Sequence, residues 1–122
     1  MAAPGKRDPR DLLPLTPAMF HVLLSLAEGD RHGYAIMKEV ATRTAGTVEL
    51  STGTLYGLVK RLLADGLIVA ALRRPPTAGD DERRRYYRLT DFGRQVAGAE
   101  AERLETLVTT ARARRILRRS EH

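Results

Sequence analysis

The spacing of apolar residues changes period along this 122-residue chain, and that change constrains the fold more than any other feature. Up to about residue 65 the apolar residues recur at steps of three and four, which is typical of helices that bury one face. Two short aliphatic or aromatic runs follow, at residues 67–72 and 85–89, and each indicates a strand. After residue 90 the helical spacing returns. This order predicts three helices, a β-hairpin and a last helix.

Residues that start or stop helices delimit these elements. Thr16 before Pro17 predicts a helix start, because a hydroxyl can cap free amides and proline has no N–H to leave unpaired. The apolar stripe that follows stops at Gly29. A second stripe predicts a helix over residues 33–44, and Thr90 is expected to cap the last helix.

The third helix is predicted over residues 51–65, with Ser51 as its N-cap and Gly66 after its end. Helical spacing places its apolar residues on one buried face, and these are Leu55, Leu58, Val59, Leu62 and Leu63. Gly53 and Gly57 lie on the opposite face, where each glycine costs about 1 kcal/mol relative to alanine. Close approach of the helix backbone to a ligand or partner would offset that cost, and a helix that enters the major groove of DNA is such a case.

The candidate DNA-reading residues of this helix are Ser51, Thr52, Gly53, Thr54, Tyr56, Gly57 and Lys60. Hydroxyl groups and free amides at its N-terminal end could bind phosphates, and the helix dipole favours the same contact. The alternative is that Ser51 only caps the helix and that the glycines are tolerated defects. Arg61 shares this face with Lys60, which favours an anionic partner.

The predicted hairpin has a tip too long for a tight turn, because residues 75–81 hold two prolines, a glycine and two aspartates. Five arginines flank the tip, and these are Arg73, Arg74, Arg83, Arg84 and Arg85. Antiparallel pairing would bring these like charges together, so an anionic partner is a simpler account than stability. The alternative is a solvated loop that Asp80, Asp81 and Glu82 partly neutralise.

The formal net charge of +6 is confined to one part of the chain. Residues 1–50 hold six Lys or Arg against six Asp or Glu, whereas residues 51–122 hold fifteen against nine. A basic excess in one region is the usual footprint of a polyanion partner, because each neutralised phosphate releases a condensed counterion. A solvated basic face without a partner is the alternative.

Three helices followed by a long-tipped hairpin is the order of a winged helix-turn-helix. We therefore expect a mainly α fold with a β-hairpin, in which residues 16–90 form the winged-helix domain. Residues 1–15, with three prolines among charges, predict a flexible N-terminal arm. The last helix, over residues 91–119, is too long to be covered by so small a core.

An apolar seam at alternating steps of four and three runs along this last helix and predicts that it is a dimerisation helix. The seam residues are Ala97, Ala101, Leu104, Val108 and Ala111, with Leu107 beside them. Small residues bury little area, so we expect further dimer contacts from Met19 or Phe20 in the first helix. The alternative is that the last helix folds back on its own core.

Several classes of protein are not supported. The chain has no cysteine, and none of the three histidines (His21, His32 and His122) has a second ligand at metal spacing. It also lacks GxSxG, HExxH and a glycine-rich phosphate loop, so we expect no enzyme, no metal and no cofactor. No apolar run approaches the roughly 20 residues that span a bilayer, and the first residues do not form a leader, so we expect a cytoplasmic protein without membrane contact.

An RNA-binding or ribosome-associated basic module is the alternative to a DNA-binding regulator. Such modules usually display aromatic side chains on a sheet to stack on bases. Only Tyr86 and Tyr87 qualify here. Tighter binding of a palindromic duplex than of single-stranded RNA would decide between the two classes.

The motif SxGTLY at residues 51–56, followed by RL at 61–62, GLI at 66–68 and RRYYxLT at 84–90, resembles the PadR family of transcriptional regulators. The resemblance implies a winged-helix repressor that binds a partly palindromic operator as a homodimer and is often released by a small-molecule effector. It also implies that Tyr34 contacts the DNA backbone and that Arg84 and Arg85 belong to the wing. Gly57 stands where the family often has proline, and the single last helix resembles the smaller PadR-like subgroup.

Overall fold

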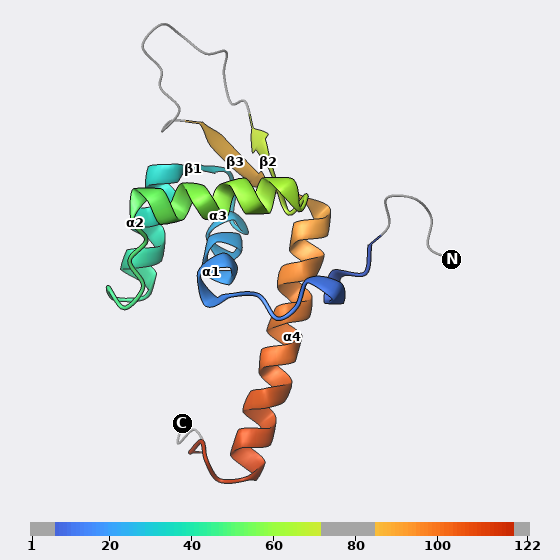
Figure 1. The fold of residues 1–122 in the computed structure, drawn as a ribbon. Coiled ribbons are helices and arrows are strands. Elements are labelled where there is room, and N and C mark those ends of the chain that lie inside the picture. The colour runs from blue at the N-terminus through green and yellow to red at the C-terminus, as the bar shows by residue number, and fades with distance from the viewer. Residues whose placement is uncertain (1–6, 72–84, 119–122) are drawn as a thin grey trace, which may run out of the picture.

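A computed structural model describes residues 7–71 and 85–118 of the chain (Figure 1). The elements in chain order are the 3-10 helix η1 (Pro9–Leu12), α1 (Pro17–Leu26), β1 (Arg31–His32), α2 (Gly33–Arg43), α3 (Thr52–Ala64), β2 (Ile68–Ala71), β3 (Tyr86–Leu89) and α4 (Asp91–Ala113). The predicted winged-helix architecture, with three helices, a strand pair and a long last helix, is confirmed. The tip of the hairpin lies outside the described residues.

Side-chain caps start the helices where the sequence predicts them. The hydroxyl of Thr16 accepts the Met19 N–H at 3.2 Å, and the hydroxyl of Thr90 accepts the Gly93 N–H at 2.9 Å. The cap of α2 was not predicted: His32 Nδ1 accepts the Ala35 N–H at 3.1 Å. Each of these bonds satisfies an amide that the first helical turn leaves free.

The described strands form an antiparallel sheet in the order β1-β3-β2. The predicted hairpin pairs Ile68 with Leu89 and Ala71 with Tyr86. The third strand, β1, was missed, because its two residues are too short to show an alternating pattern. It pairs with β3 and ties the start of α2 to the sheet.

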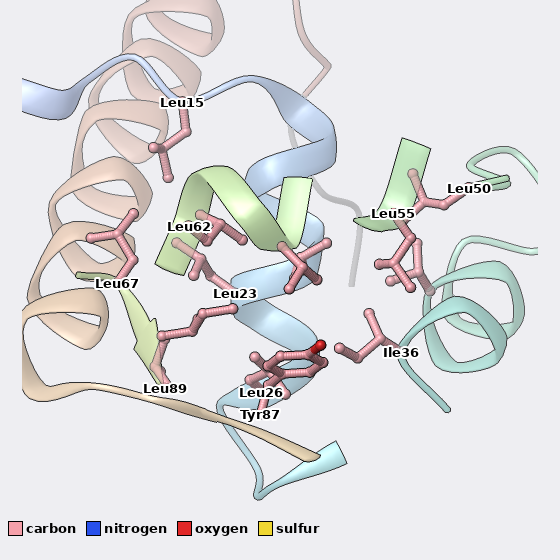
Figure 2. Close-up of a cluster of buried hydrophobic side chains, with 14 of the residues drawn as sticks. Leu15, Leu23, Leu26, Ile36, Leu50, Leu55, Leu62, Leu67, Tyr87 and Leu89 are labelled. Atoms are coloured by element: carbon pink, nitrogen blue, oxygen red, sulfur yellow. The ribbon is translucent and has the colours of Figure 1, made fainter. Parts of the chain in front are cut away.

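The core gathers side chains from α1, α2, α3, α4 and the sheet (Figure 2). Its fully buried side chains include Val22, Leu23, Leu26, Ile36, Val40, Leu55, Leu62, Leu67, Ile68 and Val96. In α3 the predicted buried face is confirmed for Leu55, Val59 and Leu62, whereas Leu58 is half-buried. The prediction was wrong for Leu63, which is 37% exposed because it lies at the edge of this stripe near the helix end.

The N-terminal segment differs from the flexible arm that the sequence predicts. Residues 9–12 form η1, which packs on α4, and Leu12 and Leu13 pack against the core. Leu15 is buried, and its N–H donates to the Glu100 carboxylate at 3.1 Å. The leucines supply apolar surface that the core and α4, both distant from it in sequence, help to cover.

Helix α4 starts tightly against the domain and then leaves it (Figure 1). A Cβ on Gly93 would lie well inside van der Waals contact of the Leu67 carbonyl oxygen, so glycine permits the close approach of the two backbones. The helix ends at Ala113, short of the predicted residue 119, and the chain reverses at Arg115, whose φ is 62°. Its second half projects beyond the core, as its length predicts.

Candidate nucleic-acid interface

The face of α3 opposite its buried leucines is open. A Cβ built on Gly53 or on Gly57 would meet no described atom within 4 Å. Leu55 and Val59, each two residues from a glycine along the helix, are buried. The solvent face of α3 therefore lacks a side chain at two positions one turn apart, and nothing within the described chain requires glycine there.

The N-terminal end of α3 carries exposed hydroxyl groups. Ser51 accepts the Thr54 N–H at 3.1 Å and donates its own hydroxyl proton to the Thr54 side chain at 2.9 Å. Ser51 is thus the predicted cap. Thr52 is exposed beside it, so the first turn presents hydroxyls and unpaired amides to solvent.

Lys60 and Arg61 continue this face toward the C-terminal end of α3. Both are exposed, and Arg61 pairs with Asp65 at 3.6 Å. Lys60 makes no ion pair with the described residues. An exposed ion pair contributes little to stability, so both cations remain available to an anion.

Tyr56 lies differently from the other predicted DNA-contacting residues of α3. It is half-buried, and a Cβ on Gly33 would lie 2.5 Å from its hydroxyl oxygen. Its side chain therefore points toward the start of α2, and glycine at position 33 makes room for it. The Tyr56 ring therefore does not cover the open face next to Gly53 and Gly57.

The start of α2 adds aromatic and basic side chains beside α3. Tyr34 is 58% exposed, and the Lys38 ammonium lies 5.6 Å from the centre of its ring. The His32 ring stacks with Tyr34 at 6.4 Å and meets Tyr86 edge-on at 5.4 Å. Lys38 was not predicted as a site residue, although it stands one helical turn after Tyr34 on the same face.

The wing is described only at its base. Arg85 is exposed, directly before β3. The other four predicted wing arginines, Arg73, Arg74, Arg83 and Arg84, lie outside the described residues. In β3 itself, Arg88 forms an ion pair with Asp30 at 2.8 Å and so joins the sheet to the loop after α1.

The predicted dimer residues divide into two groups. Met19, Phe20 and Ala97 are half-buried and pack against the core of their own chain. Farther along α4, Leu107 is 53% exposed and Val108 is 39% exposed. The remaining seam residues, Ala101, Leu104 and Ala111, are exposed or half-buried. The distal seam thus presents apolar side chains that its own domain does not cover.

Two features are not found in the part of the chain that is described. Residues 7–71 and 85–118 contain no cluster of three His, Asp or Glu side chains that could hold a metal ion. No helix within these ranges combines the length and the apolar character needed to cross a membrane.

Comparison with known protein families shows which family the chain belongs to. Residues 22–99 match the transcriptional regulator PadR-like family. The chain belongs to this family. The PadR-family match begins inside α1 and ends in α4 just before Glu100, so it contains the described helix-turn-helix and the sheet.

Solved structures and a further protein sequence are similar to this chain. A transcriptional regulator from Clostridium thermocellum is 28% identical with a TM-score of 0.64, over 78% of this chain and 86% of that one. Bacillus subtilis PadR in complex with operator DNA is 21% identical with a TM-score of 0.59, over 69% of this chain and 46% of that one. An uncharacterized protein from Lysinibacillus sphaericus is 33% identical over 73 residues, and the match covers 60% of this chain and 64% of that protein.

Proposed function

We propose that this PadR-family regulator is a repressor that binds a partly palindromic operator as a homodimer, with α3 in the major groove. The open glycine face of α3 carries the proposal. A major groove is about 12 Å wide and admits a helix whose backbone can approach the base edges closely. Gly53 and Gly57 leave that approach unobstructed, since a Cβ at either position meets no described atom within 4 Å.

The groups around this face can bind the phosphate backbone of DNA. Ser51 and Thr52 present hydroxyls at the N-terminal end of α3, where the helix dipole also favours a phosphate. Lys60 adds a positive charge on the same side, and Tyr34 stands exposed at the start of α2. The charge of +6 supports a polyanion as the partner.

The wing completes the proposed interface. Arg85 at its base is exposed, and the proposal assigns the wing arginines Arg73, Arg74, Arg83 and Arg84 to phosphates or to the minor groove. Such contacts add affinity for every DNA sequence alike, whereas α3 would provide the sequence specificity. Bacillus subtilis PadR, a relative of the same fold, has been solved in complex with operator DNA, which supports DNA as the partner.

The distal part of α4 supports the proposed homodimer. Leu107 and Val108 expose apolar surface that a second copy of α4 would cover. Two-fold pairing would present two α3 helices to successive major grooves, about 34 Å apart, and so requires half-sites about 10 base pairs apart or a multiple of this. A small-molecule effector, which the family resemblance implies, would act by releasing this complex.

Selection of bound sequences from a random duplex library tests the proposal. We expect the selected duplexes to share two inverted half-sites. Affinity for the selected duplex should exceed that for single-stranded RNA of the same sequence by at least about 1000-fold, which is the ordinary margin of specific binding. Equal affinity for the RNA would instead support an RNA-binding module.

A further inference from the structure

The N-terminal segment of residues 7–15, which we call the brace, crosses α4 on its way to α1 (Figure 1). Its 3-10 helix η1 packs on α4, and Leu12 and Leu13 pack against the core. The brace lies outside the residues that match the PadR-like family, as does α4 from Glu100 onward. Both ends of the brace make specific contacts with the helices that the proposed function uses.

At the first end, one side chain touches both α3 and α4. The Arg7 guanidinium carbon lies 4.4 Å from the ring centre of Phe92, in the first turn of α4. The same guanidinium donates to the main-chain carbonyl oxygen of Asp65, the C-cap of α3. Arg7 therefore joins the end of the proposed recognition helix to the start of the proposed dimerisation helix.

At the second end, the brace supplies a hydrogen bond to a buried charge of α4. Glu100 is 2% exposed, and its carboxylate accepts the Leu15 N–H at 3.1 Å and the Arg103 Nε–H at 2.5 Å. A carboxylate is costly to bury unless such bonds replace water. Glu100 is the last buried residue of α4, which is described throughout, so it marks the point where this helix leaves the domain.

We propose that the brace fixes the direction in which α4 leaves the winged helix and thereby sets the distance between the two α3 helices of the dimer. Arg7 and Glu100 act as positioning residues at the two ends of this attachment. Without the brace, α4 would keep its packing near Gly93, Val96 and Ala97 and its contacts with α1, all in its first half, and a small rotation there would be magnified along the projecting helix. This inference rests on the dimer of the proposed function.

Operator spacing gives the brace a functional consequence. Adding one base pair between half-sites shifts one of them by about 3.4 Å and rotates it by about 34° around the duplex. A rigid dimer cannot follow that shift, whereas a dimer with a loose α4 can. The brace would therefore determine which half-site spacing the protein accepts.

A distance measurement in the free protein tests the inference without DNA. The chain has no cysteine, so Lys60→Cys provides a single labelling site on the exposed face of each α3. Pulsed dipolar spectroscopy of the spin-labelled dimer should give a narrow distance distribution. The brace variant Arg7→Ala with Leu12→Ser should broaden it by about twofold or more, because the attachment of α4 becomes a hinge.

The matched control is Arg10→Ala, which removes an arginine of the same segment. The Arg10 side chain is 77% exposed, and among residues 7–71 and 85–118 it pairs only with Asp8, within the brace itself. The control should leave the distribution unchanged. If Leu12→Ser reduces folding, Arg7→Ala alone serves as the test, because it removes no core side chain. If the distance distribution is equally wide in the brace variant and in the protein with its brace intact, the inference is overturned. If neither protein gives a dipolar signal, the proposed dimer is overturned as well.

Operator binding supplies the second measurement, with unlabelled protein and duplexes whose half-site spacing varies by one or two base pairs. The protein with its brace intact should bind one half-site spacing with at least about tenfold higher affinity than the others. For the brace variant, this difference in affinity should be about threefold or less. Affinity for a single half-site should be the same in both. If neither the protein with its brace intact nor the brace variant binds a single half-site, the proposed DNA contact is contradicted. The distance measurement in the free protein would still test the role of the brace.

Discussion

Glycines illustrate how the same residue serves different purposes at different places in this molecule. On α3, Gly57 faces open solvent, and a side chain there would meet no described atom within 4 Å. At the start of α2, Gly33 makes room for the Tyr56 hydroxyl. At the start of α4, Gly93 lets two backbones approach. Substitutions at these residues therefore separate effects on binding from effects on folding.

Replacing Gly57 by glutamate tests the open face. The side chain has room in the free protein, so folding should stay cooperative, but its bulk and negative charge would meet the DNA. We expect operator affinity to fall by at least about 100-fold in a gel-shift titration. Gly98→Glu is the matched control, because Gly98 is also helical and unobstructed but lies on α4. Affinity of Gly57→Glu within about threefold of the original would rule out α3 as the groove-binding helix.

Replacing Gly93 by alanine tests the close approach of α4. The new methyl group would collide with the Leu67 carbonyl oxygen, and a backbone atom cannot move aside cheaply. We expect the free energy of unfolding to fall by about 2 kcal/mol, measured by urea denaturation. Gly98→Ala should leave stability unchanged or raise it by up to about 1 kcal/mol, because alanine favours the helix. A Gly93→Ala protein as stable as the original would mean that α4 packs differently.

At the scale of elements, α4 combines a packed first half with a projecting second half. Glu100 and Arg103 lie where the two halves meet. The hydrogen bond from Arg103 lowers the pKa of Glu100, burial opposes this, and the Leu15 N–H lowers the pKa further. The net direction is a pKa below the ordinary value of 4.5.

A lowered pKa in the folded state makes stability depend on pH with a defined sign. The ionised Glu100 contributes stability above its unfolded pKa, and this contribution is lost as pH falls through the lower folded pKa. Glu100→Gln cannot be protonated in this way. We expect the free energy of unfolding to fall more steeply between about pH 5 and pH 3 in the original protein than in Glu100→Gln. If the free energy of unfolding depends on pH in the same way in both proteins, ionised Glu100 does not contribute to stability.

At the scale of the whole molecule, assembly depends on the projecting half of α4. Changing Leu107 and Val108 to aspartate would place four like charges in a two-fold interface. Both side chains are exposed in the single chain, so the winged helix should remain folded. We expect sedimentation at micromolar concentration to give a monomer whose operator affinity is about 100-fold lower, because two half-sites no longer act together.

The control for this assembly test adds the same charges elsewhere on the helix. Thr109 and Thr110 are exposed neighbours of the seam and point away from it at helical spacing. Changing both to aspartate should leave the dimer intact. A dimer that survives Leu107→Asp with Val108→Asp would show that the seam of α4 is not the interface.

The sequence by itself determined the helices, the paired strands and the open face of α3. Caps such as Ser51 and Thr90 act on amides three residues away, and the apolar period of a helix or strand is legible within a single window. Local features of this kind need no knowledge of the rest of the fold. The motifs from residue 51 to residue 90 led to the family for the same reason.

Only the tertiary structure decided the features that depend on residues far apart in sequence. Glu100 looks like a surface charge in its helical window, yet it is buried because Leu15, 85 residues earlier, donates to it. Tyr56 points toward α2 because Gly33 leaves room, and β1 exists because β3 lies beside it. The brace is ordered for the same reason: its leucines have too little surface to fold alone, and α4 covers them once the chain is folded.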